Sequence, residues 1–178
     1  MAILPIRLFG DPVLQRRADE VDHFDSELRD LTIDMIDTVK AENGVGLAGP
    51  QVGHCKRIFL VSDLNGQETF QVYINPVILE GSGIDHEEEG CLSLPDIRSK
   101  VERKASILLQ AYDLSGKRLQ LEATGLYARI FQHELDHLDG ILFVQRIPRA
   151  KRFFLKSRLD QIRSDARKRL IHIEGDPK

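Results

Sequence analysis

Residues 132–140, with the sequence QHELDHLDG, constrain this chain more than any other segment. His133 and His137 lie four positions apart, so on an α-helix both imidazoles project from one face, one turn apart. Glu134 is rotated by about a quarter turn from His133, where its carboxylate can reach a metal-bound water without occupying the metal. The pattern predicts a rigid helix that supplies two metal ligands and a general base. The alternative is a surface helix whose histidines make ordinary hydrogen bonds.

A third ligand is needed, because catalytic sites of this kind usually combine three protein ligands with one position for water. Cys91 is the upstream candidate: it lies in the polar, turn-like stretch EEEGCLSLP, so its sulfur need not be buried. A third histidine in the pattern HxxxHxxGxxH is excluded, since Phe143 occupies that position. Glu174, a glutamate four residues from the end, is a weaker option. A buried packing cysteine is the alternative interpretation of Cys91.

The rest of the chain favours a single α+β domain over residues 1–178. Antiparallel β-sheets are expected around the central metal-binding helix, with an N-terminal helix and a C-terminal amphipathic helix. Asp25 is the expected N-cap of the first helix, which should end at Asn43 and Gly44. The next segment, GVGLAGPQVG, contains four glycines and a proline, which predicts a tight loop.

Apolar runs predict the strands. They are expected at residues 57–61 and 72–79, and Pro76 places the second at a sheet edge or makes it bulged. Residues 105–123 predict a β-hairpin, because two β-compatible runs flank a Ser-Gly turn. Thr124 should then cap the central helix.

Charge is distributed unevenly along the chain. Residues 146–169 contain ten Lys or Arg and two Asp, a net +8, although the whole chain carries −3, so the remainder carries −11. A basic amphipathic helix is expected at about residues 149–170. Such a helix often meets an anionic partner, and a simple solvated helix is the alternative.

Apolar runs and cysteine content bear on membrane binding and on location. No apolar run approaches the length of a membrane span, so no membrane partner is expected. Two cysteines and no recognisable secretion signal favour a reducing cytoplasm.

Three segments together resemble the peptide deformylases. The family motifs GxGxAAxQ, EGCLS and QHExDH occur here in the same order, as GVGLAGPQ, EGCLS and QHELDH. The resemblance extends from residue 10 to residue 143, and three motifs in register are far more specific than the helix motif alone. It implies a metal-dependent hydrolase that removes the N-formyl group from the initiator methionine of new polypeptides. The implied reaction is attack by a metal-bound water, with a glutamate as general base.

The resemblance also implies roles for individual residues. The metal ligands would be the three residues with sulfur or imidazole donors: Cys91, His133 and His137. Glu134 would be the general base, and Gln51 and the backbone N–H of Leu92 would stabilise the developing oxyanion. Substrate contacts would come from small or apolar residues: Gly46, Val45, Gly90, Leu126 and Ile130.

The same resemblance implies one divalent ion, with Fe²⁺ favoured and Zn²⁺ or Ni²⁺ as alternatives. It implies N-formyl-methionyl nascent peptides as substrates and the ribosome as a partner of the basic helix, with no sequence-specific nucleic acid. The location would be cytoplasmic, and an organellar one is left open. Two other functions compete: a related amidohydrolase or peptidase acting on another N-acyl group, and a non-catalytic domain braced by the metal.

Two residues depart from the family pattern. Gly49 replaces the usual second alanine of the first motif, so we expect a more flexible loop around Gln51. Arg129 lies four residues before His133, where many members have an apolar residue. We expect its guanidinium to extend to solvent.

Overall fold

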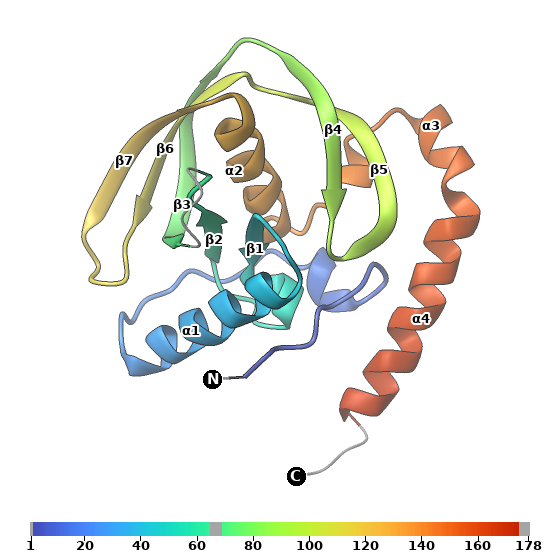
Figure 1. The fold of residues 1–178 in the computed structure, drawn as a ribbon, viewed down its shortest axis with the longest axis horizontal. Helices are drawn as coiled ribbons and strands as arrows, with labels where there is room; N and C mark the ends of the chain where they lie inside the picture. The colour runs from blue at the N-terminus through green and yellow to red at the C-terminus, as the bar shows by residue number, and fades with distance from the viewer. Residues whose placement is uncertain (1, 65–68, 175–178) are drawn as a thin grey trace.

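The computed structural model describes residues 2–64 and 69–174, with side chains up to residue 171 (Figure 1). One antiparallel sheet contains β1 (Gly46–Ala48), β2 (Ile58–Ser62), β3 (Phe70–Ser82), β6 (Ser106–Tyr112) and β7 (Arg118–Thr124), in that order. A separate two-stranded ribbon contains β4 (Asp85–Cys91) and β5 (Leu94–Arg103). The helices are α1 (Ser26–Ala41), α2 (Gly125–Leu138), α3 (Arg149–Phe154) and α4 (Lys156–Glu174). Three short 3₁₀ helices complete the described elements: η1 (Pro12–Gln15), η2 (Gly49–Val52) and η3 (Phe143–Gln145).

Helix α2 lies between the five-stranded sheet and the β4–β5 ribbon (Figure 1). Its apolar face packs on the sheet through Phe131, whose ring centroid is 4.9 Å from that of Tyr73 and 5.9 Å from that of Phe59. This arrangement leaves the opposite face of α2, which carries the histidines, directed toward the ribbon. The expected α+β fold, with antiparallel sheets around a central helix, is confirmed.

Helix α1 covers the other face of the sheet. Strand β2 has both faces buried, because alternate residues point to opposite sides: Phe59 and Val61 face the α2 cluster, whereas Ile58 and Leu60 face the α1 cluster. The predicted N-cap is confirmed, since the Asp25 carboxylate accepts a hydrogen bond of 3.0 Å from the Leu28 N–H.

The ribbon was not predicted from the sequence. The stretch EEEGCLSLP is the end of β4 and a turn into β5, so Cys91 ends a strand instead of lying in an irregular loop. Exposed glutamates conceal the strand pattern of β4, but β5 buries Ile97 and Val101 along its length. These side chains pack against η3 and against Leu159 and Ile162 of α4, which positions α4 outside the ribbon.

Strand β3 is bulged and does not lie at an edge. It pairs with β2 on one side and β6 on the other, with a register shift between Ile74 and Val77. Pro76 has no N–H to donate, so the bulge removes the need for a ladder hydrogen bond there. Asn75 adopts a positive φ of 49° and its side chain bonds both the N–H and the carbonyl of Val21.

The hairpin and the helix start followed the prediction, whereas the C-terminal helix did not. Strands β6 and β7 form the expected hairpin. Helix α2 begins directly after Thr124 as expected, but the Thr124 side chain makes no capping hydrogen bond. The basic helix is broken at Leu155 into α3 and α4. Phe153 and Phe154 therefore leave the buried face and are 72% and 84% exposed. Within the described residues, no helix combines the length and apolar character needed to cross a membrane.

Candidate metal centre

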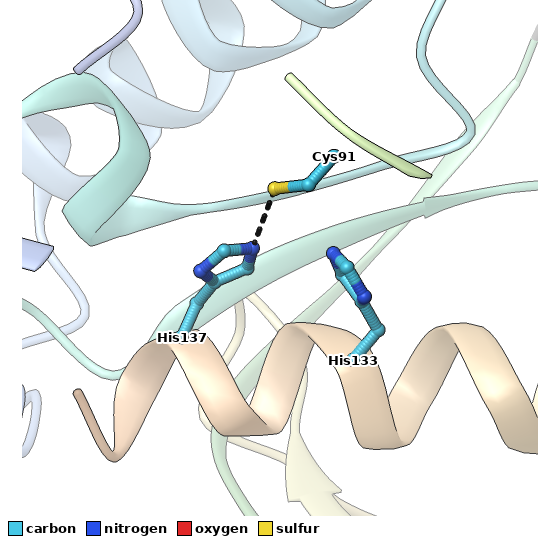
Figure 2. A group of neighbouring side chains, drawn as sticks. All are labelled: Cys91, His133 and His137. Atoms are coloured by element: carbon cyan, nitrogen blue, oxygen red, sulfur yellow. Dashed lines mark hydrogen bonds between the residues drawn. The ribbon is translucent and has the colours of Figure 1, made fainter. Parts of the chain in front are cut away.

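Three potential ligands from distant parts of the chain meet at one point. Each of Cys91, His133 and His137 offers one ligand atom, and these atoms lie within 4.8 Å of one another. The Cys91 Sγ is 3.3 Å from Nε2 of His137. Figure 2 shows the two rings projecting from α2 toward the sulfur, which comes from the end of β4. The side chain of Glu174, the weaker candidate, lies outside the described residues.

The orientation of each imidazole leaves one ring nitrogen for an ion. Nδ1 of His133 is 2.9 Å from Oε2 of Glu89, so the Nε2 atom is left for the ligand position. His137 directs Nε2 toward the sulfur. A carboxylate bonded to the second ring nitrogen is the usual support of a metal-binding histidine. One thiolate and two imidazoles suit Fe²⁺, Zn²⁺ or Ni²⁺, so the residues present fit the implied ion.

Glu89 is the support that the sequence interpretation missed. Arg103 holds it with two hydrogen bonds, from Nε to Oε1 at 2.8 Å and from a terminal nitrogen to Oε2 at 2.9 Å. Burial by itself would raise the pKa of Glu89, but hydrogen bonds from Arg103 and His133 outweigh burial and lower the pKa to about 2. Glu89 is the first residue of the EGCLS motif, so the sequence could have indicated that it belongs to the site. Arg103 carries no such signal in the sequence.

Arg129 does not extend to solvent, so that expectation was wrong. The residue is 4% exposed. Its guanidinium donates to Asp85 at 2.9 Å, to Glu89 at 2.7 Å and to the carbonyl of Val101 at 3.0 Å. These acceptors compensate the burial of the charge, which a buried arginine requires.

Glu134 lies beside the cluster on α2 and is buried. Its Oε2 atom is buried without a hydrogen-bond partner among the described residues. Burial raises the pKa of Glu134 to about 7, against an opposing effect of His133. Gly46 of β1 borders the carboxylate so closely that a Cβ at this position would overlap Oε1. The group is therefore enclosed, and its pKa is shifted toward neutral pH, the direction that suits a general base.

Gln51 points into the same site from η2. It is buried, its Oε1 accepts a hydrogen bond of 2.8 Å from Ala48 N–H, and its Nε2 lies 3.5 Å from Cys91 Sγ. Nε2 is also 3.4 Å from the hydroxyl of Ser93. Leu92, the other expected oxyanion donor, directly follows Cys91 in the turn between β4 and β5.

The expectation of a loose loop at Gly49 does not fit this geometry. A Cβ on Gly49 would lie 2.7 Å from the carbonyl oxygen of His54 and 2.9 Å from that of Lys56. Glycine therefore permits a close backbone approach at this position, and Gln51 is held by the hydrogen bonds of its amide. Alanine at this position would require the backbone to shift.

The expected substrate contacts occupy different environments. Ile130 is buried in the cluster between α2 and the sheet, whereas Val45 and Leu126 are exposed. Gly90 is exposed on β4, next to Cys91. Their contact with a substrate stays a prediction.

Two cavities of about 750 and 710 Å³ lie beside α3 and α4, and no residue of the metal cluster lines either one.

Comparison with known proteins gives a consistent result. The family model for polypeptide deformylase matches residues 3–153. A peptide deformylase from Acidobacterium capsulatum is 44% identical over 162 residues, which cover 89% of this chain and 95% of the relative. Peptide deformylase 1 from Clostridium perfringens is 46% identical over 144 residues, covering 81% and 97%.

Solved structures agree with the sequence comparison. The crystal structure of peptide deformylase from Thermus thermophilus matches with a TM-score of 0.86 and 41% identity, over 92% of this chain and 99% of that one. The peptide deformylase from Legionella pneumophila matches with a TM-score of 0.85 and 36% identity, over 90% and 95%. Because the motifs and the whole fold agree with those of these proteins, this chain belongs to the peptide deformylase family.

Proposed function

We propose that Cys91, His133 and His137 hold one divalent metal ion, and that Glu134 and Gln51 act on the substrate beside it. The chain is a hydrolase that removes the N-formyl group from newly made polypeptides. The observation that supports this division of roles is the meeting of three ligand atoms within 4.8 Å next to a buried carboxylate whose pKa is about 7.

The proposed reaction hydrolyses one amide bond. When bound, the ion supplies a Lewis acid that polarises the formyl oxygen and lowers the pKa of a water. Glu134 takes a proton from the attacking water and later gives it to the leaving nitrogen, because its pKa lies close to neutral pH. The water oxygen forms a bond to the formyl carbon, the carbon–nitrogen bond breaks, and formate and a free N-terminal amine leave.

Gln51 and Leu92 are the proposed donors to the oxyanion. The Gln51 carbonyl is fixed by Ala48 N–H, so the amide nitrogen is directed at the cluster before substrate arrives. Donors fixed in advance need no reorganisation when negative charge develops on the formyl oxygen, and this makes them effective. The backbone of Gly46 and Gly90 and the side chains of Val45, Leu126 and Ile130 are the proposed contacts for the peptide and its methionine.

Ferrous iron is the proposed ion, and zinc and nickel are alternatives that the same thiolate and imidazole donors accept. A cytoplasmic location belongs to the proposal, because the chemistry requires Cys91 as a free thiolate and a reducing compartment preserves it.

Comparing formyl-methionyl with acetyl-methionyl peptides tests the proposed substrate. Gly46 encloses the Glu134 carboxylate closely, and we propose that a site this confined accepts a formyl hydrogen more readily than a methyl group. We expect the ratio of kcat/KM values to favour the formyl peptide by about 100-fold or more. Similar values for both peptides would support the related amidohydrolase instead.

The ribosome is the proposed partner of the basic surface formed by α3 and α4. Several cations of α4 already form ion pairs within the chain: Lys156 and Arg163 with Asp160, and Lys168 with Asp165. Lys151, Arg167 and Arg169 are exposed and form no ion pair with the described residues, so they are the proposed contacts for phosphate groups. Deleting the whole segment is a poor test, because Leu159, Ile162 and Ala166 belong to the core.

We therefore expect the triple variant Lys151→Gln, Arg167→Gln and Arg169→Gln to bind ribosomes more weakly while hydrolysing a short formyl peptide normally. The slope of log affinity against log salt should decrease by about 0.7–0.9 for each phosphate that the variant no longer neutralises. Sedimentation binding over a salt series measures both quantities. The control carries the same charge change elsewhere on the surface, at Arg16, Arg17 and Lys40. Equally weakened binding in both variants would mean that only net charge matters and would contradict a specific surface.

A further inference from the structure

We propose that Arg129 is a positioning residue for the metal site. Together with Asp85, it holds the ribbon that carries Cys91 against the helix that carries His133 and His137. This inference rests on the proposed metal-binding role of those three residues and adds a determinant of how well they converge.

The ribbon needs such an anchor. Strands β4 and β5 pair with each other and not with the described strands of the five-stranded sheet, which lies on the other side of α2 (Figure 1). A two-stranded ribbon has little stability of its own. The packing of β5 on η3 and α4 holds the outer side of the ribbon, so its distance from the two imidazoles depends on the side chains that connect it to α2.

Arg129 connects α2 to both strands. It lies one turn before His133 and donates to Asp85 and Glu89 of β4 and to the backbone carbonyl of Val101 in β5. Other polar contacts of α2 reach only one strand: His133 bonds Glu89 of β4, and Asp136 bonds Arg103 of β5. Among the described residues, Arg129 is thus the α2 side chain whose hydrogen bonds connect both strands to the helix.

Arg129 also belongs to a chain of six alternating charges. In spatial order its members are Asp85, Arg129, Glu89, Arg103, Asp136 and Arg146. Each guanidinium except the last lies between two carboxylates, and the three cations balance the three anions. The four central side chains are 4–9% exposed, whereas those of Asp85 and Arg146 at the ends are 27% and 45% exposed. Balanced pairing of this kind allows charges to be buried.

The position of Arg129 in this series of charges separates the support of His133 from the placement of β4. If its guanidinium is removed, Arg103 still holds both oxygens of Glu89, so the carboxylate still supports His133. The effect then falls on the placement of β4 relative to α2, and with it on the distance from the Cys91 sulfur to the imidazoles.

The test measures metal binding as well as turnover. Arg129→Met keeps much of the length of the side chain and removes the charge. We expect its affinity for Zn²⁺ and Co²⁺, measured by competition with a chelator, to fall by about 10–100-fold. The thiolate-to-metal absorption of the Co²⁺ protein should weaken as well. Arg129→Lys should be intermediate, because an ammonium group restores the charge without the fork that reaches three acceptors.

Asp85 provides a second variant that is expected to fold, because its side chain is partly exposed. Asp85→Asn should weaken metal binding by less than Arg129→Met, and the double variant should bind no more weakly than Arg129→Met alone, since the two residues act through one contact. The matched control is Arg158→Met, which removes another Arg–Asp pair at the ribbon, the exposed one with Asp96. This control should bind metal with unchanged affinity.

Normal metal affinity in both Arg129→Met and Asp85→Asn, with only a lower unfolding temperature, would overturn the inference, because Arg129 would then serve general stability. Failure of the proposed function has a different signature. In that case the unmodified protein itself would bind Co²⁺ without thiolate absorption.

Discussion

Replacing Glu134 with glutamine is expected to lower kcat/KM for a formyl-methionyl peptide by about 10²–10⁴-fold, the usual contribution of a general acid–base group. Glutamine has nearly the same shape as glutamate but cannot take a proton from water. Because Glu134 is not one of the three ligands of the cluster, bound metal should stay near one ion per chain. Metal analysis and peptide turnover on the same anaerobic sample measure both quantities.

The stability of the Glu134→Gln variant shows whether its loss of activity comes from the missing proton transfer or from damage to the fold. The pKa of Glu134 is raised to about 7, well above that of a carboxyl group in an unfolded chain. The unfolded state therefore releases this proton at lower pH than the folded state, so ionisation of Glu134 disfavours folding progressively as the pH rises from about 4.5 to about 7. Glutamine removes this effect, and the metal-free variant should be no less stable than the parent protein at pH 8.

The surface substitution Glu88→Gln on β4 is a matched control, because Glu88 is exposed and carries the same carboxyl group. It should leave turnover unchanged. Retention of more than about a tenth of the activity in Glu134→Gln would rule out Glu134 as the principal base.

Replacing Cys91 with alanine is expected to remove both stable metal binding and turnover. Binding free energies of about 10–16 kcal/mol for four-ligand zinc sites correspond to roughly 2.5–4 kcal/mol for each ligand. Loss of one ligand should therefore weaken binding by about 10²–10³-fold. The site has only three protein ligands among the described residues, so the two imidazoles left behind should not retain the ion through dialysis against a weak chelator.

Cys55→Ala is the control for this experiment. Cys55 is the other free cysteine and packs, half-buried, against the α2 cluster. Its replacement should leave metal content unchanged. Full metal occupancy in Cys91→Ala would contradict the proposed ligand set, and loss of metal in both variants would indicate general damage to the fold.

Local rules explain which features could be predicted from the sequence. The spacing of His133 and His137 acts within one helical turn, and Asp25 caps α1 through an N–H only three residues away. The β6–β7 hairpin is likewise set by a turn between adjacent strands. Each feature depends on neighbours along the chain, so it can be inferred without knowledge of the fold.

Features that depend on distant partners were harder to predict. The β4–β5 ribbon was missed because its exposed face is acidic, and the break at Leu155 was missed because the basic helix was treated as one amphipathic stripe. Arg129 was expected to extend to solvent, because the two carboxylates that bind it, Asp85 and Glu89, lie 44 and 40 positions away in the sequence. An arginine on a helix gives no sign of such partners in the sequence.

By itself, the sequence determined that one helix would present two imidazoles and a carboxylate, because a helix fixes the relative directions of side chains within one turn. The polar stretch around Cys91 made its sulfur the candidate for a third ligand, and the family motifs then supported that choice. Only the tertiary structure decided how the Cys91 strand is held and which charges surround the site. A buried charge is stable only beside opposite charges and hydrogen-bonding groups, and these groups come from segments that meet only when the whole chain has folded.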